Sequence, residues 1–245
     1  MIPKIIHYCW FGNNDVPSFV SKNVLEWSKM NPDFKIIRWD ERNFNIDKAC
    51  SFVKDAYKNK DWAFVTDYVR LYAIFVYGGV YLDTDVKLLQ PLQKVLNDYP
   101  AGYMGFESGD KVASGLGFAA QKGDLIIKEM LEYYHKLEFN ANKLSDLACP
   151  VINTKILVQH GLKGNNTKQK IENLTILPTE YLCPINIFSG EKLFTKNTIS
   201  VHEYNASWMG KYEKIRMYII AGIKQHLPNN LVVKLRAAIS KLENK

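Results

Sequence analysis

The sequence predicts an α/β fold in which a mostly parallel sheet is flanked by helices and followed by a C-terminal helical tail. The first observation is that short, β-branched apolar runs alternate with helical segments in the order strand, helix, strand. The second is that two aspartates directly follow a brief apolar strand, at the edge where open α/β sheets bind ligands. The third is that the excess positive charge is concentrated in the tail, outside the predicted sheet.

Chain length and composition suit one main domain. With 245 residues, of which 47% are hydrophobic, the chain can bury a full core. No stretch comes near the roughly 20 consecutive apolar residues of a membrane-spanning helix, and the first residues lack the apolar region of a signal peptide. The four cysteines lack the spacing of a metal site or a disulfide framework. We therefore expect a cytoplasmic protein with free thiols, a main domain over 1–212 and a tail over 213–245.

The net charge of +7 is unevenly distributed along the chain. From Lys211 onward there are eight Lys and Arg residues against two Glu residues, which leaves residues 1–210 with only +1. A nearly neutral body offers no basic surface for nucleic acid, so we expect no nucleic-acid partner. The tail carries two apolar stripes with basic flanks, separated at Pro228. Such helices either dock on the domain or lie on an anionic membrane.

The N-terminal elements alternate between strands and helices. The apolar run 2–11 is closed by a Gly-Asn-Asn-Asp turn and predicts a buried strand. A helix is predicted from Ser18 to Met30, where an Asn-Pro-Asp sequence ends it, and 34–39 is the second strand. Helical segments follow near 48–59 and at 61–77.

The central segment leads from the long helix into an acidic motif. Gly78-Gly79 ends the helix because glycine readily leaves helical geometry. The brief strand 80–82 then runs into Asp83-Thr84-Asp85. Further elements are predicted as strands at 102–106, 116–120, 174–177 and 199–202, and as helices at 123–137 and 151–160.

Asp83 and Asp85 carry the predicted chemistry. On an extended chain, residues two apart project to the same side, so both carboxylates can face one cation. Oxygen ligands of this kind suit Mg²⁺ or Mn²⁺ that bridges phosphate oxygens. The alternative is that the motif forms a solvated turn without a ligand.

Asp67 and Arg70 lie in the helix 61–77, which is apolar on nearly every side and is therefore expected to be buried. The two residues are three apart, so they share one face and can pair. Burying them is costly without further partners. They form either a structural ion pair or polar groups in the wall of a binding pocket.

Three segments resemble the family of DXD-containing sugar transferases, of the glycosyltransferase family 32 type. They are 3–12, then 67–85 with its order of helix, diglycine, strand and DXD, and finally 202–208. The family includes initiating mannosyltransferases, bacterial capsule and lipopolysaccharide enzymes and the glucosyltransferase domain of clostridial toxins. The resemblance implies a GT-A-type, Rossmann-like fold, a nucleotide-sugar donor, Mn²⁺ or Mg²⁺, and retention of the anomeric configuration.

The resemblance also implies roles for individual residues. Trp10 would stack on the nucleobase, with a core aromatic as the alternative. Asp67 and Arg70 would hold the donor sugar. Asp83 would touch the ribose or the sugar and share the metal, which Asp85 would bind directly.

The last matching segment would complete the pocket. His202 would be a further metal ligand, with Glu203 and Asn205 as alternatives, because relatives use different residue types at this point. Ser207 and Trp208 would close over the diphosphate.

Two loops are expected near the substrates. The segment 113–117 would approach the donor sugar, since its glycines permit close backbone contact, and 150–153 would line the acceptor side. A simple connecting loop is the alternative for each.

Taken together, these features predict a retaining, metal-dependent glycosyltransferase. It would move a hexose, with UDP-hexose favoured as donor, to a glycan or lipid-linked saccharide in bacterial surface polysaccharide synthesis, as for capsule or lipopolysaccharide. The tail 213–245 is expected to bind the inner face of an anionic membrane peripherally. Two alternatives are a metal-dependent nucleotidyl- or phosphotransferase and a catalytically inactive, sugar-binding relative.

Overall fold

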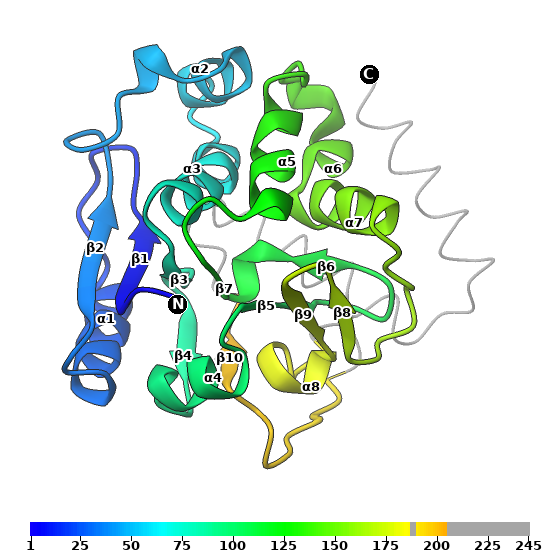
Figure 1. Cartoon of the computed structure of the whole chain (residues 1–245). Coiled ribbons are helices and arrows are strands. Elements are labelled where there is room, and N and C mark those ends of the chain that lie inside the picture. Colours follow the sequence, from blue (N-terminus) through cyan, green and yellow to red (C-terminus); the bar gives the residue numbers. More distant parts are fainter. Residues whose placement is uncertain (187–189, 205–245) are drawn as a thin grey trace. The chain divides into compact units, whose positions relative to one another are not determined.

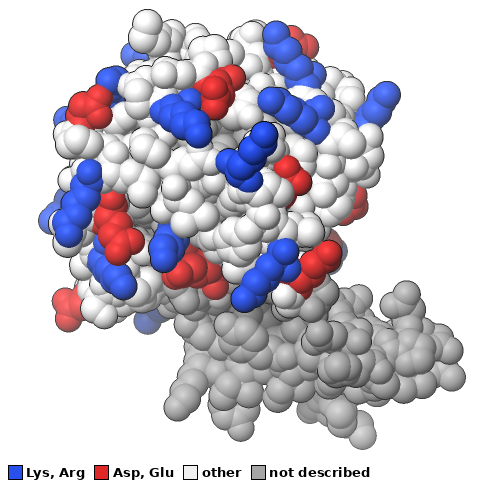
Figure 2. Space-filling view, turned by 90° about the horizontal axis from the view of Figure 1, so that it is seen from below, with Lys and Arg blue, Asp and Glu red and all other residues white. Residues whose placement is uncertain are grey.

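The computed structural model describes residues 1–186 and 190–204, so the predicted tail lies outside the described residues. Met1–Pro184 and Leu193–Tyr204 form one compact unit, and Ile185–Lys192 belong to a second. Within the described ranges, no helix combines the length and hydrophobicity needed to span a bilayer. On the face shown in Figure 2, Lys and Arg side chains are interspersed with Asp and Glu, in agreement with a body of nearly neutral charge.

A mixed sheet forms the centre of the first unit (Figure 1). Its strands lie in the order β2, β1, β3, β7, β5, β9, β8, and β6 pairs with β5. The pairs β1/β2, β1/β3 and β5/β9 are parallel and the others are antiparallel. It follows that β1, β2, β3, β5 and β9 all run in one direction, so the sheet is mostly parallel as predicted. The strands are β1 (Ile5–Cys9), β2 (Lys35–Trp39), β3 (Gly79–Tyr81), β5 (Gly102–Phe106), β6 (Val112–Ala113), β7 (Phe118–Ala120), β8 (Gln169–Ile171) and β9 (Leu174–Leu177).

Helices cover both faces of this sheet (Figure 1). Side chains alternate along a strand, so one strand can supply two separate apolar clusters: in β7, Phe118 packs into one cluster and Ala119 into the other. The helices on the first face are α2 (Ser51–Lys58), α3 (Trp62–Tyr77), α5 (Leu125–Tyr134), α6 (Leu144–Leu147) and α7 (Cys149–Gln159). Those on the second face are α1 (Ser18–Met30), α4 (Leu92–Asp98) and α8 (Thr179–Leu182).

A separate two-stranded ladder consists of β4 (Val86–Leu88) and β10 (Ser200–His202). The strands are antiparallel, and the register pairs His202 with Val86. The ladder therefore brings the last described segment of the chain beside the residue that follows the acidic motif.

The connection from α3 into β3 depends on two glycines. Gly78 has φ +68° and Gly79 has φ +116°, values that side-chain-bearing residues rarely adopt. A Cβ on Gly79 would lie 2.6 Å from the Ile5 carbonyl oxygen, so glycine also allows β3 to pair closely with β1. His7, fully buried on β1, hydrogen-bonds the Gly78 carbonyl at 2.9 Å through Nε2 and accepts the Trp39 indole N–H at 3.0 Å.

Long elements agree with the sequence-based predictions better than short ones. The helix predicted from Ser18 to Met30 has those bounds, and α3 begins one residue later than predicted. The strand predicted at 116–120 starts at Phe118 because Ser114–Leu116 form a 3-10 turn. The short elements β4, β6, β8, α4, α6 and α8 were not predicted, since none is long enough to show a clear periodicity.

Candidate active site

Asp83 and Asp85 lie on a turn between β3 and β4. The Val86 N–H donates to the Asp83 carbonyl at 3.0 Å, which closes the turn. The prediction that the motif is extended is therefore wrong. The chain bends here because β3 belongs to the large sheet, whereas β4 belongs to the two-stranded ladder.

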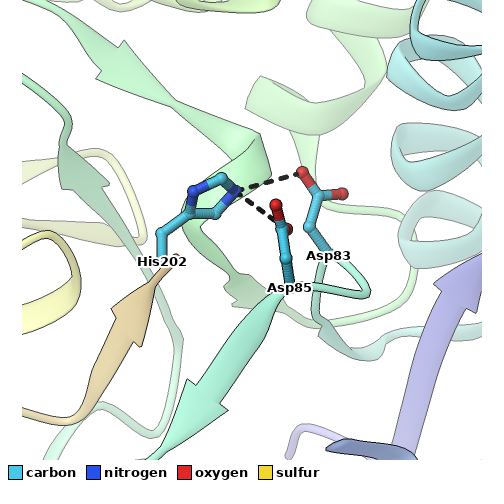
Figure 3. Close-up of side chains that lie close together, drawn as sticks. All are labelled: Asp83, Asp85 and His202. Atoms are coloured by element: carbon cyan, nitrogen blue, oxygen red, sulfur yellow. Dashed lines mark ion pairs between the residues drawn. The ribbon is translucent and has the colours of Figure 1, made fainter. Parts of the chain in front are cut away.

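His202 faces both carboxylates from the end of β10 (Figure 3). Its Nε2 atom lies 3.3 Å from Asp85 Oδ1 and 3.7 Å from Asp83 Oδ2. The Tyr204 N–H points at Nδ1 from 3.3 Å, so Nε2 carries the proton that faces the carboxylates. The pairing of β4 with β10 determines this arrangement, because it places His202 opposite Val86.

The electrostatics of these three groups are strongly coupled. Burial alone would lower the pKa of His202, but Asp83 and Asp85 outweigh it and raise that pKa above its ordinary value. Burial would raise the pKa of Asp83, but Arg70 and His202 outweigh it and hold that pKa below its usual range. Asp83 is therefore ionised near neutral pH and available to a cation.

Arg70 joins the acidic motif to α3. Its Nη2 atom lies 3.2 Å from Asp67 Oδ1 and 3.1 Å from Asp83 Oδ1. Asp67 and Arg70 are only 6% and 4% exposed, so the pair lies at the floor of the site. Burial raises the pKa of Asp67 to about 6, with Arg70 acting in the opposite direction. The predicted ion pair between Asp67 and Arg70 is thus present. Asp83 is the further partner that such a buried pair was expected to need.

Tyr81 completes this ion-pair group. Its hydroxyl donates to Asp83 Oδ1 at 2.6 Å, and its ring lies 5.1 Å from the Arg70 guanidinium carbon, within range of a cation–π contact. The prediction from sequence missed Tyr81. A signal was present, because Tyr81 and Asp83 are two residues apart at the end of a strand.

The loop 113–117 reaches the ion-pair group through Gly115. A Cβ built on Gly115 would lie 2.8 Å from Asp83 Oδ2 and 3.0 Å from Arg70 Nη1. The absence of a side chain at Gly115 therefore allows the loop to approach Asp83 and Arg70 closely. The predicted approach of 113–117 to the donor sugar stays a prediction.

The segment 150–153 forms the first turns of α7. Asn153 is fully buried and, in the orientation that satisfies its amide, accepts the Ser114 N–H at 2.9 Å. Cys149 precedes this segment, and its Sγ lies 3.6 Å from Arg70 Nη1. The start of α7 thus supports the loop that carries Gly115, and an acceptor-side role for the segment stays a prediction.

Of the other predicted site residues, Trp10 and Glu203 are described, and the rest lie outside the described residues. Trp10 follows β1 at the same sheet edge as Asp83, is half-buried, and donates its indole N–H to the Asn14 carbonyl at 3.0 Å. Glu203 is exposed, and its N–H donates to the Asp85 carbonyl at 3.0 Å. Asn205, Ser207 and Trp208 are outside the described residues, so their predicted roles stay predictions.

The residues present fit a divalent cation. Within the described chain, Asp83, Asp85 and His202 each offer a ligand atom, and these atoms lie within 4.8 Å of one another. Two carboxylate oxygens and one imidazole nitrogen suit Mn²⁺ or Mg²⁺, once the ring proton of the neutral imidazole lies on Nδ1 and the Nε2 lone pair is free. The carboxylates of Asp67, Asp83 and Asp85 outnumber the Arg70 guanidinium, so additional positive charge would be stabilised here.

Comparison with known proteins is consistent with a sugar-transfer site. Residues 17–101 match the family described as a glycosyltransferase sugar-binding region containing a DXD motif. Inositol phosphoceramide mannosyltransferase 3 of Schizosaccharomyces pombe is 28% identical over 145 residues, which cover 57% of this chain and 39% of that protein. An uncharacterized glycosyltransferase of Acanthamoeba polyphaga mimivirus is 36% identical over 93 residues, which cover 35% of this chain and 36% of that protein. The aligned region thus spans well under half the length of either relative.

A solved structure shares the fold. The PaToxG glycosyltransferase has a TM-score of 0.50 at 19% sequence identity, and the match covers 64% of this chain and 69% of that one. At this level of identity the similarity concerns the arrangement of strands and helices alone.

Proposed function

We propose that this chain, whose residues 17–101 match the family of DXD-containing glycosyltransferases, transfers a hexose from a nucleotide sugar to a saccharide. The donor is a UDP-hexose, and the anomeric configuration is retained. The observation that carries the proposal is the convergence of Asp83, Asp85 and His202 beside the Arg70 ion pairs.

Two groups of side chains divide the donor between them. Asp83, Asp85 and His202 would hold Mn²⁺ or Mg²⁺ at the diphosphate, where a bound cation stabilises the charge of the leaving group. Asp67 and Arg70 offer an acceptor and a donor of hydrogen bonds for hydroxyl groups of the sugar. Trp10 stacks on the nucleobase, and Ser207 and Trp208 close over the diphosphate.

The transfer is proposed to be dissociative. The bond between the anomeric carbon and the diphosphate oxygen breaks, and its electron pair leaves with the diphosphate. The acceptor hydroxyl forms the new bond on the same face, and its proton passes to the departing diphosphate oxygen. Arg70 stabilises the charge that develops. A covalent sugar adduct trapped on any carboxylate and detected by mass spectrometry would contradict this route.

The acceptor is proposed to be a glycan or a lipid-linked saccharide. The mannosyltransferase relative has a phosphoceramide lipid in its name, and the segment 213–245 of this chain is basic with apolar stripes. We propose that this segment binds an anionic membrane surface peripherally from the cytoplasmic side, in the synthesis of a surface polysaccharide. Deleting residues after Tyr212 would then abolish binding to anionic liposomes, and unchanged binding would contradict the proposal.

A donor panel tests the enzyme class directly. Purified protein is incubated with UDP-, GDP- and dTDP-hexoses in Mn²⁺, with and without EDTA, and nucleoside diphosphate release is measured. Release from one donor that requires metal and is lost in Asp85→Ala is expected. Release of pyrophosphate instead would indicate a nucleotidyltransferase. Donor binding by calorimetry without any turnover would indicate an inactive relative.

A further inference from the structure

Glu107 is a carboxylate at the site that has no role in the function proposed above. It directly follows β5, whose carboxyl end lies at the same sheet edge as that of β3 because the two strands run in the same direction. The Glu107 N–H donates to the Lys111 carbonyl at 2.8 Å and closes a turn whose residues 108–110 are exposed. Glu107 is half-buried at the base of this turn.

Tyr204 connects Glu107 to the metal-binding group. Its hydroxyl lies 3.3 Å from Glu107 Oε1 and donates to it, and its ring packs edge-on against His202 with centroids 4.2 Å apart. Tyr204 has φ +49°, a left-handed conformation that costs a non-glycine residue about 1 kcal/mol or more. The fold therefore holds this side chain between His202 and Glu107 at some energetic cost.

The surroundings of Glu107 leave it able to bind hydroxyl groups. It is not among the described residues that can share a cation with Asp83, and no described Lys or Arg forms an ion pair with it. Burial raises the pKa of Glu107, with His202 and the Tyr204 hydroxyl acting in the opposite direction. An ionised carboxylate accepts about four hydrogen bonds, and the described side chains supply one, from Tyr204. Neutral hydroxyl donors, which saccharides have in number, match this unused capacity.

The buried ion pair of Asp67 and Arg70 and the carboxylate of Glu107 lie at different depths in the site. Asp67 and Arg70, at 6% and 4% exposed, lie at the floor, whereas Glu107 lies beside an exposed turn at the rim. A donor held at the floor leaves the rim for the second substrate. We propose that Glu107 and Tyr204 form an acceptor subsite, in which the Glu107 carboxylate accepts a hydrogen bond from a non-reacting hydroxyl of the saccharide acceptor. This inference rests on the proposed glycosyltransferase function.

The test separates acceptor binding from donor chemistry. Full-length protein is loaded with Mn²⁺ and UDP and offered a panel of methyl hexopyranosides, and binding is followed by saturation-transfer difference NMR. Hydrolysis of the donor, with water in place of the acceptor, is measured in parallel. In Glu107→Gln, hexoside affinity should fall at least about tenfold, because the amide cannot fully replace a carboxylate acceptor. Mn²⁺-dependent hydrolysis should stay within about twofold of wild type.

Matched variants make each outcome decisive. Asp110→Asn, in the same exposed turn, should change neither quantity, and Tyr204→Phe should weaken hexoside binding by a smaller factor than Glu107→Gln. Equal loss of hydrolysis and hexoside binding in Glu107→Gln, unchanged hexoside binding, or no hexoside binding by the wild type would each overturn the subsite. Failure of the proposed function itself would look different, since wild-type protein would then hydrolyse no donor.

Discussion

Individual residues in this site are constrained by close contacts on several sides. Gly115 lies where a Cβ would come within 2.8 Å of Asp83 Oδ2 and 3.0 Å of Arg70 Nη1. These atoms are the ends of side chains, but they cannot easily move, because Arg70 is held by two ion pairs and Asp83 also accepts the Tyr81 hydroxyl. A methyl group would therefore displace a carboxylate of the proposed cation site.

Gly115→Ala should weaken Mn²⁺ binding roughly tenfold, which corresponds to about 1.4 kcal/mol, with little loss of folding stability. Electron paramagnetic resonance of free Mn²⁺ in a titration measures the affinity. Gly109→Ala is the matched control, because a Cβ on Gly109 meets no atom within 4 Å. Equal Mn²⁺ affinity in the two variants would show that Asp83 adjusts freely.

His7 has a structural role in the central sheet. It bonds the Gly78 carbonyl and the Trp39 indole, so it ties β1 to β2 and to the diglycine connection. Burial lowers the pKa of His7 to about 4, although the Gly78 carbonyl acts in the opposite direction. The folded protein therefore keeps His7 neutral at pH values where an unfolded chain would protonate it.

This difference predicts a loss of stability in acid. Below the ordinary pKa of 6.5 the unfolded chain binds a proton that the folded chain does not, so stability falls from pH 6.5 to about 4 and the His7 contribution then levels off. The loss from His7 should reach about 3 kcal/mol. Urea unfolding at several pH values should show a shallower pH dependence in His7→Gln than in the wild type. Identical pH dependence would contradict the assignment.

At the scale of elements, α1 supports the acidic turn through polar side chains spaced four residues apart. Asn23 donates to the Thr84 carbonyl at 3.0 Å, and the Trp27 indole donates to the Val86 carbonyl at 2.9 Å. Asn31 accepts the Leu92 N–H at 2.7 Å. All three are buried on one face of the helix or at its end. They satisfy backbone groups of a segment that leaves the large sheet, and Asn23 does so within the motif itself.

Asn23→Leu should weaken Mn²⁺ binding about tenfold, because the Thr84 carbonyl loses its donor and the turn can relax. It should also reduce stability by about 1–3 kcal/mol, the cost of an unsatisfied buried group. Asn31→Leu is the control: it leaves the Leu92 N–H, which lies outside the acidic motif, without its acceptor. It should therefore lose similar stability with Mn²⁺ affinity unchanged. Mn²⁺ titrations and urea unfolding of both variants provide the comparison, and parallel changes in affinity would contradict a positioning role for Asn23.

At the scale of the whole molecule, the site joins segments that are far apart in the sequence. Asp83 and Asp85 follow β3, whereas His202 ends β10, and the β4/β10 ladder brings them together. A cation held by all three groups would bind the folded chain and not the unfolded one. Metal binding should therefore stabilise the fold.

Mn²⁺ at 100 times its Kd should stabilise the protein by about 2.7 kcal/mol, which raises Tm by roughly 5–10 °C for a domain of this size. Calorimetry with and without Mn²⁺ measures the shift. Asp85→Asn should abolish most of it, and EDTA should reverse it in the wild type. A shift of the same size in Asp85→Asn would place the cation elsewhere.

The sequence by itself determined the order of the long elements and the main polar groups of the site. α1 and α3 are long enough for their periodicity and end signals to be legible, and Asp67, Arg70, Asp83 and Asp85 lie in one continuous matching segment. Only the tertiary structure decided which later side chain faces the carboxylates, that Arg70 bridges Asp67 and Asp83, and that Glu107 lies beside Tyr204. These contacts depend on the register of three-residue strands and on packing between distant segments. Local sequence patterns predict neither the register nor this packing.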